Sequence, residues 1–121
     1  MKLRIQGNLV RLRLTQKEVA SLQDPGGRVE CALRFPTGHA FNYSVLNSPD
    51  AAGVSVDYQN DSLRVVLPHA LASAWAESSS QVGIEGAPNS AVEVLVEKDF
   101  QCLHRSVEQE PDAYPNPLAA D

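Results

Sequence analysis

Apolar and polar side chains alternate along the first part of the chain, with a break at Gly7-Asn8. The apolar positions are Leu3, Ile5, Val10, Leu12 and Leu14. A period of two places every apolar side chain on one face of a strand, and a Gly-Asn step is typical of a tight turn. The pattern therefore predicts a β-hairpin with one apolar face and one cationic face.

A short helix is predicted directly after this hairpin. Thr15 and Glu18 have the spacing of a capping box, in which each side chain bonds the exposed backbone N–H of the other residue. The helix should run through Leu22 and end at residues 24–27, because Pro25 cannot continue a helix and the glycines that follow allow positive φ.

Two more strands are predicted before residue 47. Their apolar positions are Val29, Cys31 and Leu33, then Phe41, Tyr43 and Val45. Pro36-Thr37-Gly38 supplies the turn between them. The first part of the chain thus predicts the element order ββαββ.

The same order returns after the loop composition of residues 48–53. Apolar positions alternate over 54–58 and 63–67, a helix is expected from Pro68 through Ala76, and strands are expected around 82–84 and 92–96. A shift of 53 residues superimposes the two halves, so that Arg11 falls on Arg64 and Leu22 on Trp75. This shared order predicts a duplicated unit.

Few residues are identical between the halves, and Glu18 opposite Leu71 and Arg13 opposite Val66 are mismatches. A chance alignment of two alternating chains is the competing explanation. Either way the sequence predicts an α+β fold of antiparallel sheet, with a barrel-like form as one option. We expect a single domain over residues 1–105, with halves of about 1–47 and 54–100, and an acidic, Pro-rich tail over 106–121.

Charge is divided unevenly along the 121 residues. Residues 1–34 hold seven Lys and Arg against three Asp and Glu, whereas residues 48–121 hold three against twelve, and the net charge is −5. A pI near 5.1 argues against general nucleic-acid binding. No run of about 20 apolar residues and no apolar leader are present, so we expect a cytoplasmic protein without membrane contact. Two cysteines are too few for a disulfide scaffold.

The first candidate site is the cationic face of the first hairpin. It comprises Lys2, Arg4, Arg11 and Arg13, and we add Arg64 as the counterpart of Arg11. Like charges this close on paired strands repel each other unless acids or an anion neutralise them. The neutralising group could belong to the chain, from Glu30, Asp57 or the tail, or to an anionic small molecule or acidic protein segment.

The second candidate site is the run Glu97-Lys98-Asp99, for which we predict an ion-pair cluster that anchors the tail. The nearby Cys102 and His104 form at most one pair of ligands, whereas a structural zinc site needs four. No third group is available to orient a Cys-His nucleophile. The sequence therefore predicts no metal site, no cofactor and no catalytic residue.

The third candidate is Trp75, which forms an apolar ridge with Leu71 on the second helix. Core packing is the favoured explanation, and a helix-helix contact in a homodimer is the alternative.

Both ends of the chain carry longer motifs. The chain resembles a family of small bacterial proteins of unknown function. The resemblance rests on residues 1–8, 10–15, 18–19, 96–103 and 115–117. The resemblance implies a bacterial source and transfers no catalytic residue. The sequence favours a binding or interaction protein over an enzyme. The competing hypotheses are a phosphate-handling enzyme with a cationic barrel interior and a purely structural homodimer that uses the Trp75 helix or a free strand edge.

Overall fold

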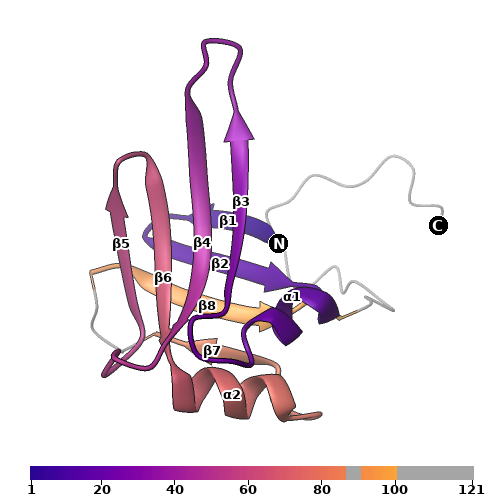
Figure 1. The fold of residues 1–121 in the computed structure, drawn as a ribbon. Coiled ribbons are helices and arrows are strands. Elements are labelled where there is room, and N and C mark those ends of the chain that lie inside the picture. The colour runs from indigo at the N-terminus through magenta and orange to yellow at the C-terminus, as the bar shows by residue number, and fades with distance from the viewer. Residues whose placement is uncertain (87–90, 101–121) are drawn as a thin grey trace, which may run out of the picture.

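The structure is a computed structural model that describes residues 1–86 and 91–100. In these residues the chain forms eight strands and two helices in the predicted order (Figure 1). The elements are β1 (Lys2–Gln6), β2 (Leu9–Leu14), α1 (Gln16–Ser21), β3 (Arg28–Arg34), β4 (Ala40–Ser48), β5 (Ser55–Gln59), β6 (Ser62–Pro68), α2 (His69–Glu77), β7 (Gly83–Glu85) and β8 (Glu93–Lys98).

The strands form two four-stranded sheets, and each sheet combines hairpins from both halves of the chain. Sheet A has the order β1-β2-β8-β7, and sheet B has the order β3-β4-β6-β5. Hairpin partners pair antiparallel, but the central pairs β2–β8 and β4–β6, which join the two halves, are parallel. The fold is thus α+β with mostly antiparallel pairing. The sheets stay separate, so the barrel-like option is wrong for the described part of the chain.

The predicted repeat is matched by the strand registers. Lys2 lies opposite Arg13 in the first hairpin, and Ser55 lies opposite Val66 in the third, which is the same pairing displaced by 53 residues. The pairing of β3 with β4 returns between β7 and β8 with the same displacement. A matching order of elements and matching hairpin registers support a duplicated ββαββ unit.

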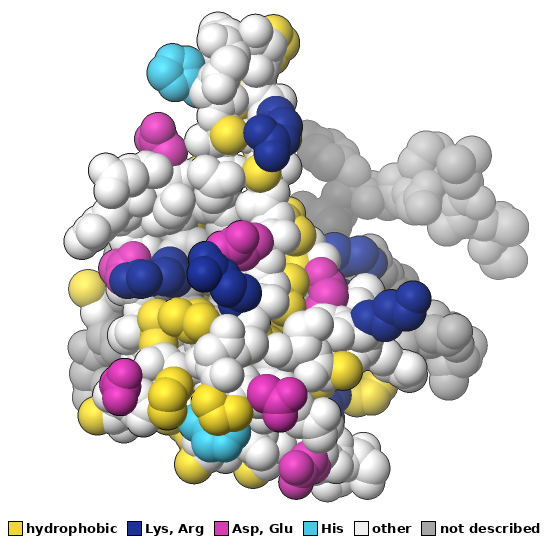
Figure 2. Space-filling model, viewed as in Figure 1, with side chains coloured by type: hydrophobic (Ala, Val, Ile, Leu, Met, Phe, Trp, Pro, Cys, Tyr) yellow, Lys and Arg dark blue, Asp and Glu magenta, His cyan; other side chains and the backbone are white. Residues whose placement is uncertain are grey.

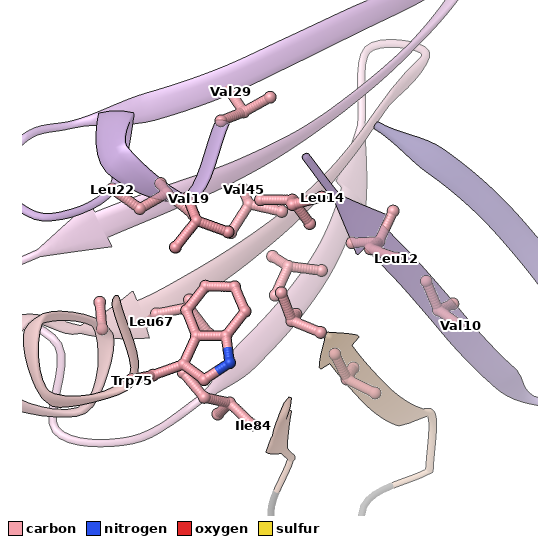
Figure 3. Packing of buried hydrophobic residues seen from close by; sticks show 14 of the residues in the cluster. Val10, Leu12, Leu14, Val19, Leu22, Val29, Val45, Leu67, Trp75 and Ile84 are labelled. Atoms are coloured by element: carbon pink, nitrogen blue, oxygen red, sulfur yellow. The ribbon is translucent and has the colours of Figure 1, made fainter. Parts of the chain in front are cut away.

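The core lies between the two sheets and is almost wholly aliphatic (Figure 3). β2 contributes Val10, Leu12 and Leu14, and residues of β4, β6 and β8 meet them from the other strands. Each helix bridges the sheets at the end away from the β3–β4 turn: α1 contacts β2 and β3, whereas α2 contacts β4, β6 and β7. The helices thereby close one end of the core.

The sequence signals around α1 act as predicted. The Thr15 hydroxyl accepts a hydrogen bond from the Glu18 backbone N–H, and a Glu18 carboxylate oxygen accepts one from the Thr15 N–H at 2.9 Å. This is the predicted capping box. After the helix, a Cβ at Gly27 would lie only 2.0 Å from the Ser21 carbonyl oxygen, so no other residue fits there without moving the backbone.

Asn47 is a buried polar residue of β4 that bonds the end of α1 and the start of α2. Its side-chain N–H₂ donates to the Leu22 carbonyl oxygen at 2.8 Å and lies 3.1 Å from the His69 ring. Its backbone groups bond Gly26 and Gly27. Buried amides are stable only when bonded in this way, so the interaction fixes the end of α1 and the start of α2 on one strand.

Trp75 is fully buried, which confirms the core interpretation of this residue. Leu71, one turn earlier, is 46% exposed, so the predicted joint ridge is wrong: of these two residues, Trp75 alone faces the core. Neither helix in the described residues has the length and apolar character needed to cross a bilayer.

Candidate functional site

The predicted cationic residues lie on two different sheets. Lys2 and Arg4 on β1 and Arg11 and Arg13 on β2 occupy the outer face of sheet A, where Lys2 lies opposite Arg13 and Arg4 opposite Arg11. Arg64 lies on β6 of sheet B. The first four residues therefore form one surface, and Arg64 is not part of it.

Glu97 on β8 bridges two of these arginines. One carboxylate oxygen accepts from the Arg11 Nε at 2.6 Å and from the Arg13 Nε at 2.8 Å. The parallel pairing of β2 with β8 sets this arrangement, because Arg13 and Glu97 are direct register partners. Glu97 is only 7% exposed although it lies on an outer face, where both arginine side chains contact it.

The pKa of Glu97 reflects this position. Burial alone would raise the pKa of its carboxyl group, but the hydrogen bonds and charges of Arg11 and Arg13 outweigh burial and lower the pKa below its ordinary value of 4.5. Glu97 is therefore an anion at neutral pH, and it neutralises the centre of the cationic face.

The rest of the run Glu97-Lys98-Asp99 points in two directions. Asp99 lies 3.2 Å from the Lys2 ammonium on the outer face. Lys98 lies on the inner side, where its ammonium donates to the Ser78 carbonyl oxygen at 2.5 Å and lies 5.7 Å from the centre of the Trp75 ring. The run thus joins β8 to β1, β2 and α2. The predicted contact with the tail, like Cys102 and His104, lies outside the described residues.

Two of the acids expected to neutralise the first hairpin pair elsewhere, and the expected tail acids lie outside the described residues. Glu30 bonds Arg28, and Asp57 bonds Arg64 at 2.9 Å, so both serve sheet B. The expectation that they neutralise the first hairpin is wrong. Glu97 and Asp99, which we assigned to a separate cluster, take that role because β8 pairs with β2.

The outer face of sheet B carries a shallow polar groove of about 660 Å³. Sheet B faces the viewer in Figure 2, where basic and acidic side chains lie together across it. Arg28, Arg34 and Arg64 line the groove, and its floor holds small polar side chains such as Ser44 and Ser62. Arg34 forms no ion pair with any described residue. Of these groove residues, only Arg64 is a candidate from the sequence.

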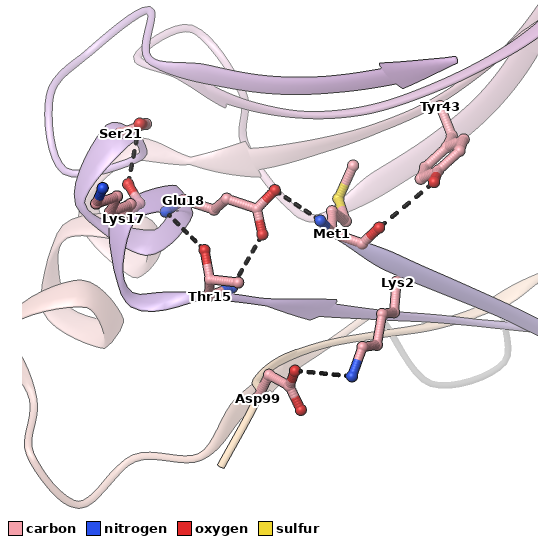
Figure 4. Close-up of polar contacts among 8 residues, drawn as sticks. All are labelled: Met1, Lys2, Thr15, Lys17, Glu18, Ser21, Tyr43 and Asp99. Carbon is pink, nitrogen blue, oxygen red and sulfur yellow. Dashed lines mark hydrogen bonds and ion pairs between the residues drawn. The ribbon is translucent and has the colours of Figure 1, made fainter. Parts of the chain in front are cut away.

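Met1 closes the edge of sheet A through polar contacts (Figure 4). Its amino group lies 2.6 Å from a Glu18 carboxylate oxygen, and its carbonyl oxygen accepts from the Tyr43 hydroxyl at 3.4 Å. Burial opposes the ionisation of Glu18, but the bonds from the Met1 amine and the Thr15 N–H outweigh it and lower the pKa of Glu18 below 4.5.

This contact predicts a stability change in acid. A carboxyl group whose pKa is lowered by folding stabilises the protein above its unfolded pKa, and that contribution is lost as the pH falls through the folded pKa. We therefore expect Glu18→Gln to lower the free energy of unfolding by about 1 kcal/mol at pH 7. Near pH 3 the variant and the parent should be almost equally stable. Urea unfolding of the parent and variant at both pH values measures this. An equal difference at both pH values would contradict it.

An apolar hollow of about 290 Å³ lies between the β1–β2 and β5–β6 turns. Ile5 and Tyr58 line it and occupy equivalent positions in the two repeats, and both side chains are more than half exposed. Phe41 lies beside Tyr58, with 6.3 Å between the ring centres. The sequence pattern predicts these side chains on the core face, but in the structure they line the hollow and stay partly open.

The arrangement does not form the cationic interior that the enzyme hypothesis requires. The space between the sheets is apolar, and Arg11, Arg13 and Arg64 lie on outer faces. Among residues 1–86 and 91–100, no three His, Cys, Asp or Glu side chains gather as a metal site would require.

Fold and charge together define a small two-sheet α+β protein with ion pairs on both outer faces. The chain belongs to a family of unknown function (DUF7009), which it matches over residues 1–118. This match confirms the resemblance to a family of unknown function, whereas the bacterial source stays a prediction. No curated protein and no solved structure matches the chain.

Proposed function

We propose that this chain is a small cytoplasmic bacterial binding protein that holds an acidic protein segment on the outer face of sheet B. The segment can come from the chain's own acidic tail or from a partner, because both offer the same carboxylates. The observation that carries the proposal is the open polar groove with three arginines, of which Arg34 has no acidic partner among the described residues.

The chemistry of the groove fits an extended carboxylate-bearing chain. Guanidinium groups bind carboxylates with two parallel hydrogen bonds, and the side chains of Arg28 and Arg64 are more than half exposed. The exposed ion pairs that they form with Glu30 and Asp57 contribute little free energy, so an incoming carboxylate can compete for the same donors. Small floor residues such as Ser44 leave space for a backbone to approach.

The cationic face of sheet A has a different role in this proposal. Arg11 and Arg13 share a buried carboxylate, and Lys2 contacts Asp99. An external anion would have to compete with Glu97, whose lowered pKa reflects its strong interaction with both arginines. We therefore assign Arg11 and Arg13 to the stability of the fold and place the binding surface on sheet B.

An oligo-glutamate peptide tests the proposal with the full chain. We expect the peptide to shift the backbone amide NMR signals of β3, β4 and β6, and we expect high salt to weaken binding. The double variant Arg28→Gln/Arg64→Gln should bind at least about tenfold more weakly, since each charged hydrogen bond contributes about 1.5 kcal/mol or more. Lys17→Gln on α1 is the control and should bind like the parent.

A second variant distinguishes the two sources of the acidic segment. Glu108→Gln/Glu110→Gln/Asp112→Asn removes three tail charges. If the tail occupies the groove, this variant binds the peptide more tightly than the parent does; if a partner occupies it, the two affinities are equal. Signal shifts confined to β1 and β2, or no shifts at all, would refute the assignment to sheet B.

A further inference from the structure

β3 is an exposed edge of sheet B. Among residues 1–86 and 91–100 it pairs with β4 on one side only, and the β3–β4 hairpin extends beyond the body of the molecule (Figure 1). Near its tip, Leu33 is 55% exposed and Phe35 is 48% exposed. Long edge strands with exposed apolar side chains pair readily with another strand.

The hydrogen-bonding direction along β3 follows from one contact. The Phe35 N–H donates to the His39 carbonyl oxygen at 2.8 Å, so Phe35 and the odd-numbered residues before it direct their backbone groups toward β4. The backbone groups of the even-numbered residues therefore point to the open edge. These residues are Arg28, Glu30, Ala32 and Arg34.

We propose that β3 pairs antiparallel with β3 of a second copy of this chain, with Ala32 opposite Ala32 on the two-fold axis. This register places Glu30 opposite Arg34 of the second copy, and by symmetry Arg34 opposite Glu30. Opposite charges directly across paired strands attract, and Arg34 gains the acidic partner that it lacks among the described residues.

Neighbouring registers do not give this match. A slide of two residues in one direction places Arg28 opposite Arg34 of the second copy, and a slide in the other direction places Glu30 opposite Pro36. The first slide brings like charges together. The second also places Ala32 opposite Arg34, so neither Glu30 nor Arg34 meets a charged partner. The charge pattern of β3 therefore selects one register.

The inner face of the same register covers the exposed apolar side chains. Leu33 lies opposite Cys31 of the second copy, and Phe35 lies opposite Val29. These are non-hydrogen-bonded pairs, in which the side chains approach most closely. The outer faces of sheet B in the two copies become one eight-stranded surface. The dimer would therefore also join the two polar grooves.

Charge reversal tests the interface with the full chain. We expect the parent to sediment as a dimer at tens of micromolar, and Glu30→Arg or Arg34→Glu alone to raise the dimer dissociation constant about tenfold or more by setting like charges opposite each other. An equimolar mixture of the two variants should form a heterodimer, because each opposes the other with complementary charge. Lys17→Glu, a charge reversal on α1, should remain dimeric.

A disulfide fixes the register independently. In a Cys102→Ser background, Leu33→Cys should form a covalent dimer with the native Cys31 of the second copy under mild oxidation, and Cys31→Ser should abolish it. A parent that remains monomeric at several hundred micromolar, a mixture that fails to dimerise, or crosslinking that survives Cys31→Ser would overturn the proposal. None of these results depends on peptide binding, which tests the proposed function separately.

Discussion

Trp75→Ala should lower the free energy of unfolding by about 3–5 kcal/mol, the largest loss that we expect from one substitution. The indole is fully buried in the core, where Leu67 and Ile84 lie near it (Figure 3). Its N–H donates to the Val82 carbonyl oxygen at 3.2 Å, and the Lys98 ammonium lies over the ring. Alanine would therefore leave a cavity and remove contacts that join α2 to β7 and β8. Urea unfolding followed by circular dichroism measures the loss.

Two variants show which property of Trp75 matters. Trp75→Phe keeps most of the apolar volume but removes one of the two donors to the Val82 carbonyl oxygen, which keeps the Lys98 backbone N–H at 2.9 Å, so we expect a loss of about 1–2 kcal/mol. Leu71→Ala removes an exposed side chain from the same helix and should change stability by about 0.5 kcal/mol or less. If Leu71→Ala destabilised the protein as much as Trp75→Ala, Leu71 would have to be covered in solution, as the helix-helix dimer requires.

Local structure was predictable because it depends on neighbouring residues. Alternation located the strands to within a few residues, and the Thr15–Glu18 spacing identified the cap of α1. The repeat could be predicted for the same reason, since each half carries the same local signals in the same order. The central parallel pairs carry no such signal. β2 and β8 are more than 70 residues apart, and neither Gly-Asn turns nor apolar periods specify which distant strand lies beside which.

The partners of the charged residues were hard to predict because they depend on which distant strands pair. The outward direction of Arg11 and Arg13 follows from the period of two, but their shared partner Glu97 is 84 and 86 residues away. We expected Glu30 and Asp57 instead, because without the strand order any outward acid is an equal candidate. Each sheet combines one hairpin from each half of the chain. β8 and its acids therefore belong to sheet A, whereas β3 and β5 belong to sheet B.

Glu97→Ala should destabilise the protein by about 2–3 kcal/mol, although Glu97 lies on an outer sheet face. The substitution removes the carboxylate that Arg11 and Arg13 share, on a face where Arg4 and Lys2 lie opposite them on β1. Removal of one partner from a largely buried, doubly bonded ion pair costs several times more than loss of an exposed pair. High salt should restore part of the lost stability by screening the repulsion between the cations.

The repeat supplies a matched control. Arg64 is the counterpart of Arg11, but its partner Asp57 is exposed and makes a single contact at 2.9 Å. Asp57→Ala should therefore cost about 0.5 kcal/mol or less. Glu97→Gln, which keeps the shape but removes the charge, should fall between the two, and it should weaken the dependence of stability on pH below 4.5, because the lowered pKa of Glu97 contributes to that dependence. Equal losses for Glu97→Ala and Asp57→Ala would mean that the Arg11–Glu97–Arg13 contact is no stronger than a surface ion pair, and the cationic face of sheet A would again be available to an external anion.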